Sequence, residues 1–287
     1  MIKITALTKE FRRQAVFENL SLTLLSKRTV ILGPNGSGKT TLFRCMVGYY
    51  RNYKGSILIN DQDENHIGYL PQFFSIFPTL TVREALELFL TIQYPYFVDR
   101  VANIQHCLEL TNLSSFSNTL VKHLSGGMKQ RLGIAQAFLG DPDLIILDEP
   151  FVGLDPEERL RIIEGIRNYD GGANIVLSTH IANDVQQLNA DVVLLDHGSV
   201  LFQGSEQDFV APLYNRIYYL NDSQHLPENA FVVRRELDQK KVFMPSGDRA
   251  ITGEYTLANP TVEDAYIVRI REAHSCDQSP YCFTNPS

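Results

Sequence analysis

The sequence lacks a hydrophobic run long enough to cross a membrane. Its longest apolar stretches, such as LIIL and DVVLLD, have the length of a strand, whereas a membrane-spanning helix needs about 20 apolar residues. The N-terminal segment MIKITALTKEF also lacks the basic start and apolar stretch of a signal peptide. We therefore expect a cytoplasmic chain that does not itself span a membrane.

Cysteine and excess positive charge are also scarce. The four cysteines, Cys45, Cys107, Cys276 and Cys282, show no Cys-x-x-Cys spacing of the kind found in zinc and redox motifs. Cys45 is expected to be a small buried thiol. Cys276 and Cys282 could pair, but the reducing cytosol favours free thiols. The net charge of −7 argues against general nucleic-acid binding, which needs a basic surface.

What is present is a glycine-rich loop, ILGPNGSGKTTLF, between an apolar strand and a helix start. It matches G-x-x-x-x-G-K-[ST] in the strand–loop–helix context that this phosphate-binding motif requires. Its three glycines can adopt positive φ, so backbone N–H groups can converge on phosphate oxygens. Lys39 is expected to reach the β and γ phosphates, and the Thr40 hydroxyl to bind Mg²⁺. The expected nucleotide-binding residues here are Gly33, Asn35, Gly36, Ser37, Gly38, Lys39, Thr40 and Thr41.

Apolar runs on both sides of the loop predict an α/β fold. DLIILDEP and ANIVLSTH are continuous apolar segments, typical of parallel sheets. Shorter runs within residues 1–32 and the segment GSILIN predict an N-terminal antiparallel β portion. Residues from about 79 to 140 show helical periodicity that opens on a capping box between Thr81 and Glu84. We therefore expect a phosphate-loop NTPase core with an inserted helical subdomain.

The domain organisation follows from a change in composition after Gly204. We expect one nucleotide-binding domain over residues 1–205 and a small α+β appendage over residues 206–287. Within the appendage, LNDSQHLPENA is expected to be a linker. The final segment, CDQSPYCFTNPS, is expected to be a mobile tail.

A second motif, LIILDEP at residues 144–150, ends a predicted strand in two carboxylates. In a phosphate-loop ATPase, Asp148 is expected near Mg²⁺, and Glu149 where an attacking water would sit. A surface Asp-Glu pair at a strand end is a common alternative. The phosphate loop in the same chain favours the catalytic interpretation.

The segment LSGGMKQR, residues 124–131, indicates one family. With it, the chain resembles the ATP-binding subunits of ABC transporters, whose signature sequence this is, over about residues 2–205. The resemblance implies ATP binding and hydrolysis with Mg²⁺. It also implies roles for four further residues: Gln72 of the glutamine loop as a catalytic and metal-binding residue, Asp155 of the D-loop, the catalytic switch histidine His180, and Phe11 in place of a tyrosine that stacks on adenine.

The same resemblance implies a head-to-tail dimer. Ser125, Gly126 and Gly127 open a helix, and their hydroxyl and N–H groups can bind an anion. In the family, this segment faces the nucleotide held by the phosphate loop of the other subunit. ATP would then bridge two copies of the chain, with Lys39 and His180 from one copy and Ser125 and Gly127 from the other.

The sequence leaves two alternatives for the process that ATP hydrolysis powers. The main hypothesis is a subunit that serves separate transmembrane permease subunits at the cytoplasmic face of a membrane, resembling the ABC-2 export type. The alternative is a soluble ABC ATPase of iron–sulfur cluster assembly. The transported substrate is not encoded in this chain, because in this family the transmembrane partner lines the path.

A crowded apolar segment just after the glutamine loop has two interpretations. Phe73, Phe74, Ile76 and Phe77 either line a groove for a short helix of the transmembrane partner or pack against the chain's own helical subdomain.

Overall fold

The computed structural model describes residues 1–12, 14–60, 66–226, 229–236, 238–245 and 255–276. The chain divides into two compact units, Met1–Val200 and Leu201–Ser287. Cys282 and the expected mobile tail after Cys276 lie outside the described residues. None of the helices in the described part is both long and apolar enough to span a bilayer.

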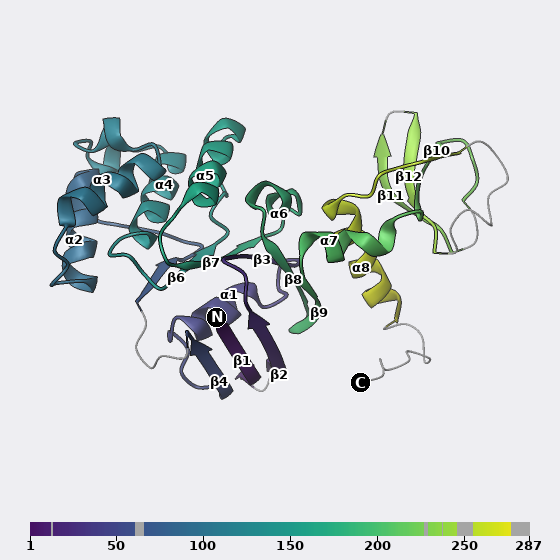
Figure 1. Cartoon of the computed structure of the whole chain (residues 1–287), viewed down its shortest axis with the longest axis horizontal. Helices are drawn as coiled ribbons and strands as arrows, with labels where there is room; N and C mark the ends of the chain where they lie inside the picture. Colours follow the sequence, from purple (N-terminus) through teal and green to yellow (C-terminus); the bar gives the residue numbers. More distant parts are fainter. Residues whose placement is uncertain (13, 61–65, 227–228, 237, 246–254, 277–287) are drawn as a thin grey trace. The chain divides into compact units, whose positions relative to one another are not determined.

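Five strands of a six-stranded sheet lie within the first unit, and the sixth, β9, begins at its end (Figure 1). Its strand order is β5 (Ile67–Leu70), β6 (Leu144–Asp148), β7 (Asn174–Thr179), β3 (Arg28–Leu32), β8 (Asp191–Asp196) and β9 (Ser199–Gly204). Neighbours from β5 to β8 pair in parallel. Strand β6 is fully buried, as its continuous apolar sequence predicts. Because parallel strands end at one edge of the sheet, the segments after β3, β6 and β7 are brought together there.

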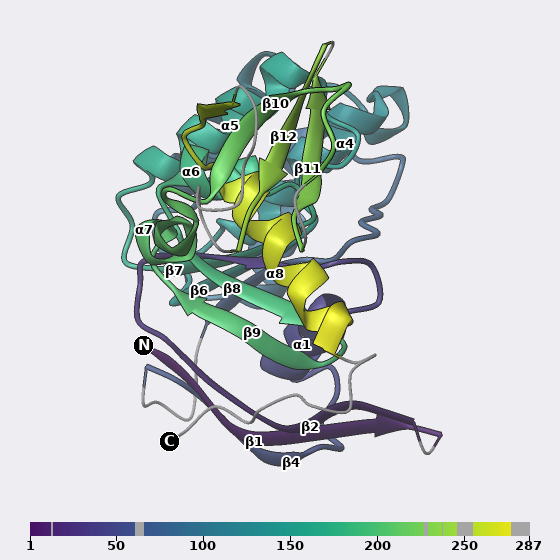
Figure 2. The ribbon, with the colours of Figure 1, turned by 90° about the vertical axis from the view of Figure 1, so that its right-hand side faces the viewer.

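A second, antiparallel sheet lies on the other side of helix α1 (Lys39–Met46) (Figure 2). It consists of β2 (Gln14–Leu24), β1 (Ile2–Phe11) and β4 (Lys54–Ile59). Leu42, Phe43 and Met46 of the helix belong to one core cluster with residues of both sheets. The helix that follows the phosphate loop is therefore held on two sides, and the expected N-terminal antiparallel portion is confirmed.

The expected helical segment contains α2 (Val82–Gln93), α3 (Arg100–Leu110) and α4 (Gly126–Ala137), with short turns η1 (Ser114–Phe116) and η2 (Val121–His123). The predicted capping box at the start of α2 is confirmed: Thr81 Oγ1 accepts from the Glu84 N–H, and the Glu84 carboxylate accepts from the Thr81 N–H. Helices α5 (Pro156–Asn168) and α6 (Asn183–Leu188) connect β6 to β7 and β7 to β8.

The second unit contains a four-stranded antiparallel sheet of its own. Its order is β11 (Phe231–Glu236), β12 (Gln239–Phe243), β10 (Ile217–Asn221) and β13 (Tyr255–Leu257), and its helices are α7 (Glu206–Val210), the turn η3 (Ala211–Leu213) and α8 (Val262–Cys276). A buried ion pair joins Lys241 of β12 to Asp264 of α8, with Nζ and Oδ2 2.6 Å apart.

One sequence prediction for this unit is wrong. The segment expected to be a linker, residues 220–230, begins within β10 and leads to β11. Since β10 pairs with β12 and β13, this segment connects two strands inside one sheet and does not separate two domains. Its polar, proline-containing composition suits a connection between strands as well as a linker.

Candidate functional site

The glycine-rich loop runs from Gly33 to Gly38, between β3 and α1. Positive φ is confirmed at Gly36 (84°) and Gly38 (111°), a conformation that side chains disfavour. Gly33 is required for a different reason. A Cβ there would lie 2.1 Å from the Leu195 carbonyl oxygen at the end of β8.

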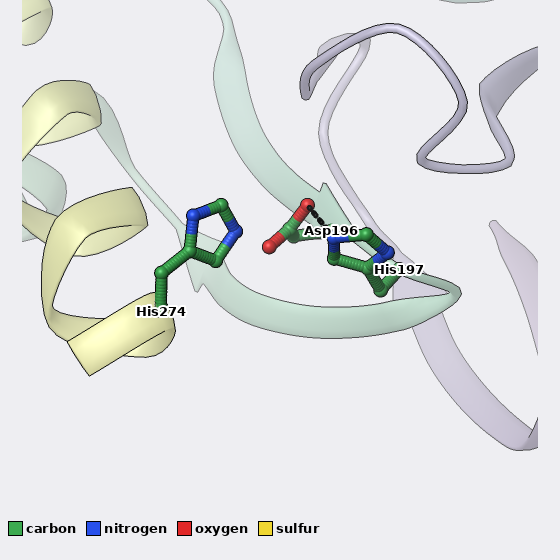
Figure 3. A group of neighbouring side chains, drawn as sticks. All are labelled: Asp196, His197 and His274. Atoms are coloured by element: carbon green, nitrogen blue, oxygen red, sulfur yellow. Dashed lines mark ion pairs between the residues drawn. The ribbon is translucent and has the colours of Figure 1, made fainter. Parts of the chain in front are cut away.

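The turn after β8 forms a hydrogen bond to the backbone of this loop. The Gly198 N–H donates to the Ser37 carbonyl oxygen at 3.0 Å. Strand β8 ends in Asp196, which is almost fully buried and whose Oδ1 lies 3.9 Å from Nε2 of His197 (Figure 3). The loop is therefore braced by a neighbouring strand end as well as by α1.

Lys39 is buried at the start of α1 and is folded back over the loop. Its Nζ donates to the carbonyl oxygens of Gly33 at 2.8 Å and Pro34 at 3.0 Å, and it lies 3.9 Å from Glu149 Oε1. Burial lowers the pKa of Lys39 from its ordinary value, while the charges of Glu149 and Asp148 act to raise it. Among the described residues, the Lys39 ammonium group has no ion pair closer than the 3.9 Å one with Glu149, which favours the approach of further negative charge.

A pocket of about 380 Å³ lies along the loop. It brings together loop residues, a β2 residue, the predicted glutamine and the second carboxylate. Its lining residues are Val16, Asn35, Gly36, Gly38, Lys39, Thr40, Thr41, Gln72 and Glu149. Residues predicted from three separate motifs therefore share one pocket.

Asp148 is the last residue of β6 and Glu149 comes directly after it, and the two have different backbone conformations. Asp148 is fully buried, and its Oδ1 accepts from the Ser178 hydroxyl at 2.6 Å. Glu149 has a φ of 51°, so its backbone leaves the strand and its side chain reaches the pocket. The Glu149 N–H donates to Ser178 Oγ at 2.8 Å.

His180, directly after β7, faces the same carboxylate. Its Nδ1 lies 3.0 Å from Glu149 Oε2, and its side chain is about half exposed. The fully buried Asp184 fixes the turn after His180 by accepting from Thr179 Oγ1 at 2.6 Å and by pairing with Arg159 of α5. Glu149 thus lies between a lysine and a histidine, an arrangement that suits a general base.

The residues predicted to bind Mg²⁺ are compatible with a divalent cation. Asp148 Oδ2 is buried and has no hydrogen-bond partner among the described residues. The same holds for Oγ of Ser37 in the phosphate loop, which was predicted to bind the nucleotide. Oxygen atoms of this type are the ligands that Mg²⁺ prefers. Thr40 and Gln72 both line the adjoining pocket.

The signature segment forms the start of α4. Ser125 is the N-cap, and its Oγ accepts from the Met128 N–H at 3.1 Å. A Cβ on Gly127 would lie 2.9 Å from Glu158 Oε2, the end of a side chain that can shift, and 3.3 Å from the Gly153 carbonyl oxygen. From the next turn of α4, Gln130 Nε2 donates to the Pro150 carbonyl oxygen at 3.0 Å.

Several predicted residues do not line the pocket of their own chain. Gly33, Ser37 and Asp148 are near its lining residues in the sequence but are not among them. Ser125, Gly126 and Gly127 are outside it, and His180 contacts the lining residue Glu149. Phe11 packs edge-on against Tyr50, with ring centroids 5.1 Å apart, and Lys9 Nζ lies 4.5 Å from the centre of the Phe11 ring.

Two residues at the site were not singled out by the sequence. Val16 lines the pocket, and Ser178 bonds both carboxylate residues. Val16 is part of an ordinary strand pattern. Ser178 could have been found only from the register of β6 against β7, which sets it beside Asp148.

The ABC transporter family profile matches residues 17–152. The ABC transporter ATP-binding protein YxlF of Bacillus subtilis is 31% identical over 239 residues, which cover 79% of this chain and 78% of that protein. The chain belongs to the ATP-binding proteins of ABC transporters. It is therefore an ATP-binding protein and an ATP hydrolase, and the phosphate-loop fold predicted from the sequence is confirmed.

Other ABC relatives differ in transport direction. The Nod factor export ATP-binding protein I of Ralstonia nicotianae is 31% identical over 224 residues, 73% of this chain and 68% of that protein. A probable sulfate/thiosulfate import protein of Chlorella vulgaris is 30% identical, covering 72% of this chain and 92% of that protein. A solved dimeric ATP-binding cassette bound to ADP and Pi is 26% identical with a TM-score of 0.64, over 71% of this chain and 98% of that one. These names give no support to iron–sulfur cluster assembly.

Proposed function

We propose that two copies of this chain close head to tail around two ATP molecules and that the resulting cycle drives export through separate transmembrane subunits. One observation carries the dimer: the start of α4 with Ser125 is outside the pocket that the phosphate loop lines in its own chain. A second copy would supply it. The solved dimeric relative, bound to ADP and Pi, supports this arrangement.

Within one composite site, each residue has a proposed role. The loop amides and Lys39 hold the β and γ phosphates of ATP, and Val16 with Phe11 receives the adenine end. Glu149 Oε1 or Oε2 takes a proton from the attacking water, and the His180 ring, 3.0 Å away, holds that carboxylate in place.

Thr40, Gln72 and Asp148 are the proposed ligands of Mg²⁺, which would neutralise charge on the phosphate oxygens. The orphaned Asp148 Oδ2 supports this role. Ser125 and Gly127 of the partner copy would donate to the γ phosphate from the opposite side. Hydrolysis removes the group that both copies bind, so the dimer opens.

A crosslinking experiment tests the head-to-tail arrangement. In a background where Cys276 and Cys282 are serine and Glu149 is glutamine, chains carrying Asn35→Cys are mixed with chains carrying Ser125→Cys. With MgATP, a short thiol crosslinker should join the two chains. A partner carrying Ser115→Cys, also exposed on the helical segment, is the control. Equal crosslinking to positions 115 and 125 would contradict the arrangement.

A second pocket is the proposed docking site for the transmembrane subunit at the cytoplasmic face. It has a volume of about 390 Å³ and combines the segment after the glutamine loop with α2. Its lining residues are Ser75, Ile76, Phe77, Pro78, Leu88, Phe89 and Ile92. Phe77 is 63% exposed, whereas Phe74 packs against Phe89 with ring centroids 6.0 Å apart. The apolar segment thus partly packs on its own subdomain and partly leaves apolar surface for a short helix.

Cysteine placement tests this docking site. In membranes that hold the complete transporter, Phe77→Cys should crosslink to a transmembrane subunit. Leu160→Cys on α5, which is 49% exposed, should not. Crosslinks from Leu160→Cys, with none from Phe77→Cys, would contradict this docking site and place the interface at α5.

Export is proposed because the Nod factor relative is named for export. Inside-out membrane vesicles supplied with a cell extract and external ATP test the direction. A compound that accumulates inside the vesicles with the wild-type chain, but not with Lys39→Ala, would support export. ATP-dependent loss of a preloaded compound from the vesicles would support import.

A further inference from the structure

A buried hydroxyl on β7 lies between the two carboxylate residues of the site. Ser178 is fully buried and stands beside Asp148 in the parallel register of β6 and β7. Its Oγ donates to Asp148 Oδ1 at 2.6 Å and accepts from the Glu149 N–H at 2.8 Å. A serine hydroxyl has one proton to donate, so this pair of bonds uses it on the Asp148 carboxylate.

The bond to Glu149 holds the backbone where it leaves the sheet. The register of β6 against β7 ends at Asp148 and Ser178, and Glu149 then takes a φ of 51°. Its buried N–H needs an acceptor, because an unpaired buried amide is costly. Ser178 Oγ supplies it in place of a strand carbonyl. The direction in which the Glu149 side chain leaves β6, toward Lys39 and His180, therefore depends on this hydroxyl.

The bond to Asp148 fixes which oxygen stays available. Oδ1 is engaged by Ser178, whereas Oδ2 is buried without a hydrogen-bond partner among the described residues. We propose that Ser178 is a positioning residue that presents Asp148 Oδ2 to the Mg²⁺ of MgATP and holds the backbone of the base Glu149. This inference rests on the metal-binding and catalytic roles proposed above for these two residues.

Metal affinity, measured without turnover, is the main test. The melting temperature of the chain is followed at a fixed concentration of a non-hydrolysable ATP analogue while MgCl₂ is titrated, with the analogue and EDTA as the reference. We expect Ser178→Ala to raise the Mg²⁺ concentration at the midpoint about tenfold, since a hydrogen bond to a charged group is lost. Ser178→Thr keeps the hydroxyl and should stay within about threefold of the wild type. ATP binding in EDTA should be unchanged in both variants.

Kinetics separate positioning from general damage. In Ser178→Ala, kcat should fall at saturating MgATP and excess Mg²⁺, while KM for MgATP changes little, because the base is misplaced but the phosphate loop is intact. Thr179→Val is the matched control for the Mg²⁺ titration. It removes the neighbouring buried hydroxyl, which donates to Asp184 and contacts neither Asp148 nor Glu149, so the Mg²⁺ concentration at the midpoint should not change.

The outcomes distinguish this inference from the proposed function. If Asp148→Asn shifts the Mg²⁺ midpoint strongly and Ser178→Ala leaves it unchanged, the role of Ser178 is overturned and the metal site stands. If Asp148→Asn has no effect on the midpoint either, the proposed metal role of Asp148 fails, and the inference fails with it. Should Ser178→Ala not fold, Ser178→Cys carries the same test, because a thiol is only a weak donor.

Discussion

Two helices of the first unit begin at glycine-containing segments, and their first turns are built differently. Helix α1 follows Gly38, and no side chain in the described part of the protein caps it. A buried lysine is its first residue. Helix α4 follows Ser125, whose own hydroxyl accepts from the Met128 N–H. The first two residues of α4 are glycines. Neither helix carries an acidic residue in its first turn.

This difference in the first turns suggests different roles for α1 and α4 in ATP binding. The uncapped amides of α1 and the charge of Lys39 form a site that can bind an anion by itself. The start of α4 has already satisfied part of its donors, so it adds a smaller contribution to an anion that is bound elsewhere. We therefore expect changes at α1 to remove ATP binding and hydrolysis, and changes at α4 to remove hydrolysis while binding persists.

The largest effect is expected from Lys39→Ala. Loss of this buried charge removes the main electrostatic contact to the phosphates, and hydrolysis should fall by about 10²- to 10³-fold. ATP affinity should fall as well, while the melting temperature without ligand changes little. A steady-state ATPase assay and a binding assay with a fluorescent ATP analogue measure the two. Undiminished turnover would mean that α1 does not hold the phosphates.

Ser125→Arg should affect hydrolysis more than binding. The long cation would intrude on the γ phosphate held by the other copy, so turnover should fall by about a hundredfold, whereas each chain still binds ATP through α1. Ser115→Arg adds the same charge at an exposed position of the helical segment and should behave like the wild type.

Mixing the two variants sharpens the comparison further. A Lys39→Ala chain with intact α4 and a Ser125→Arg chain with intact α1 can form one complete composite site. The mixture should regain part of the activity that each variant lacks alone. A Ser125→Arg chain that is fully active by itself would show that α4 does not face ATP across the dimer.

A smaller, pH-dependent effect is expected at α1 alone. Because burial lowers the pKa of Lys39 below its ordinary 10.5, the neutral amine appears earlier as the pH rises. The protonated form binds phosphate, so ATP affinity should weaken with rising alkaline pH before pH 10.5 is reached. Titration of ATP binding in Glu149→Gln and in Glu149→Gln with Lys39→Ala measures this. The alkaline loss should disappear in the second variant, and a loss that persists there would belong to another group.

The sequence predicted the phosphate loop, both carboxylates and the helical segment, because short motifs and apolar periodicity encode them locally. It could not predict that Gly33 is required by the Leu195 carbonyl rather than by positive φ, since residues 162 positions apart meet only in the folded sheet. The role of Ser178 depends likewise on strand register. The polar segment 220–230 was misinterpreted because composition alone does not distinguish a linker from a connection between strands.

The central claim is that ATP joins two copies of this chain, and Glu149→Gln tests it most directly. This change removes the general base and one negative charge while leaving Asp148, the loop amides and Ser125 in place, so turnover should fall at least about a hundredfold. ATP-bound dimers should then accumulate. In size-exclusion chromatography, the variant should elute as a monomer with ADP and as a dimer with MgATP. An inactive variant that binds ATP yet remains monomeric at saturating MgATP would contradict the account.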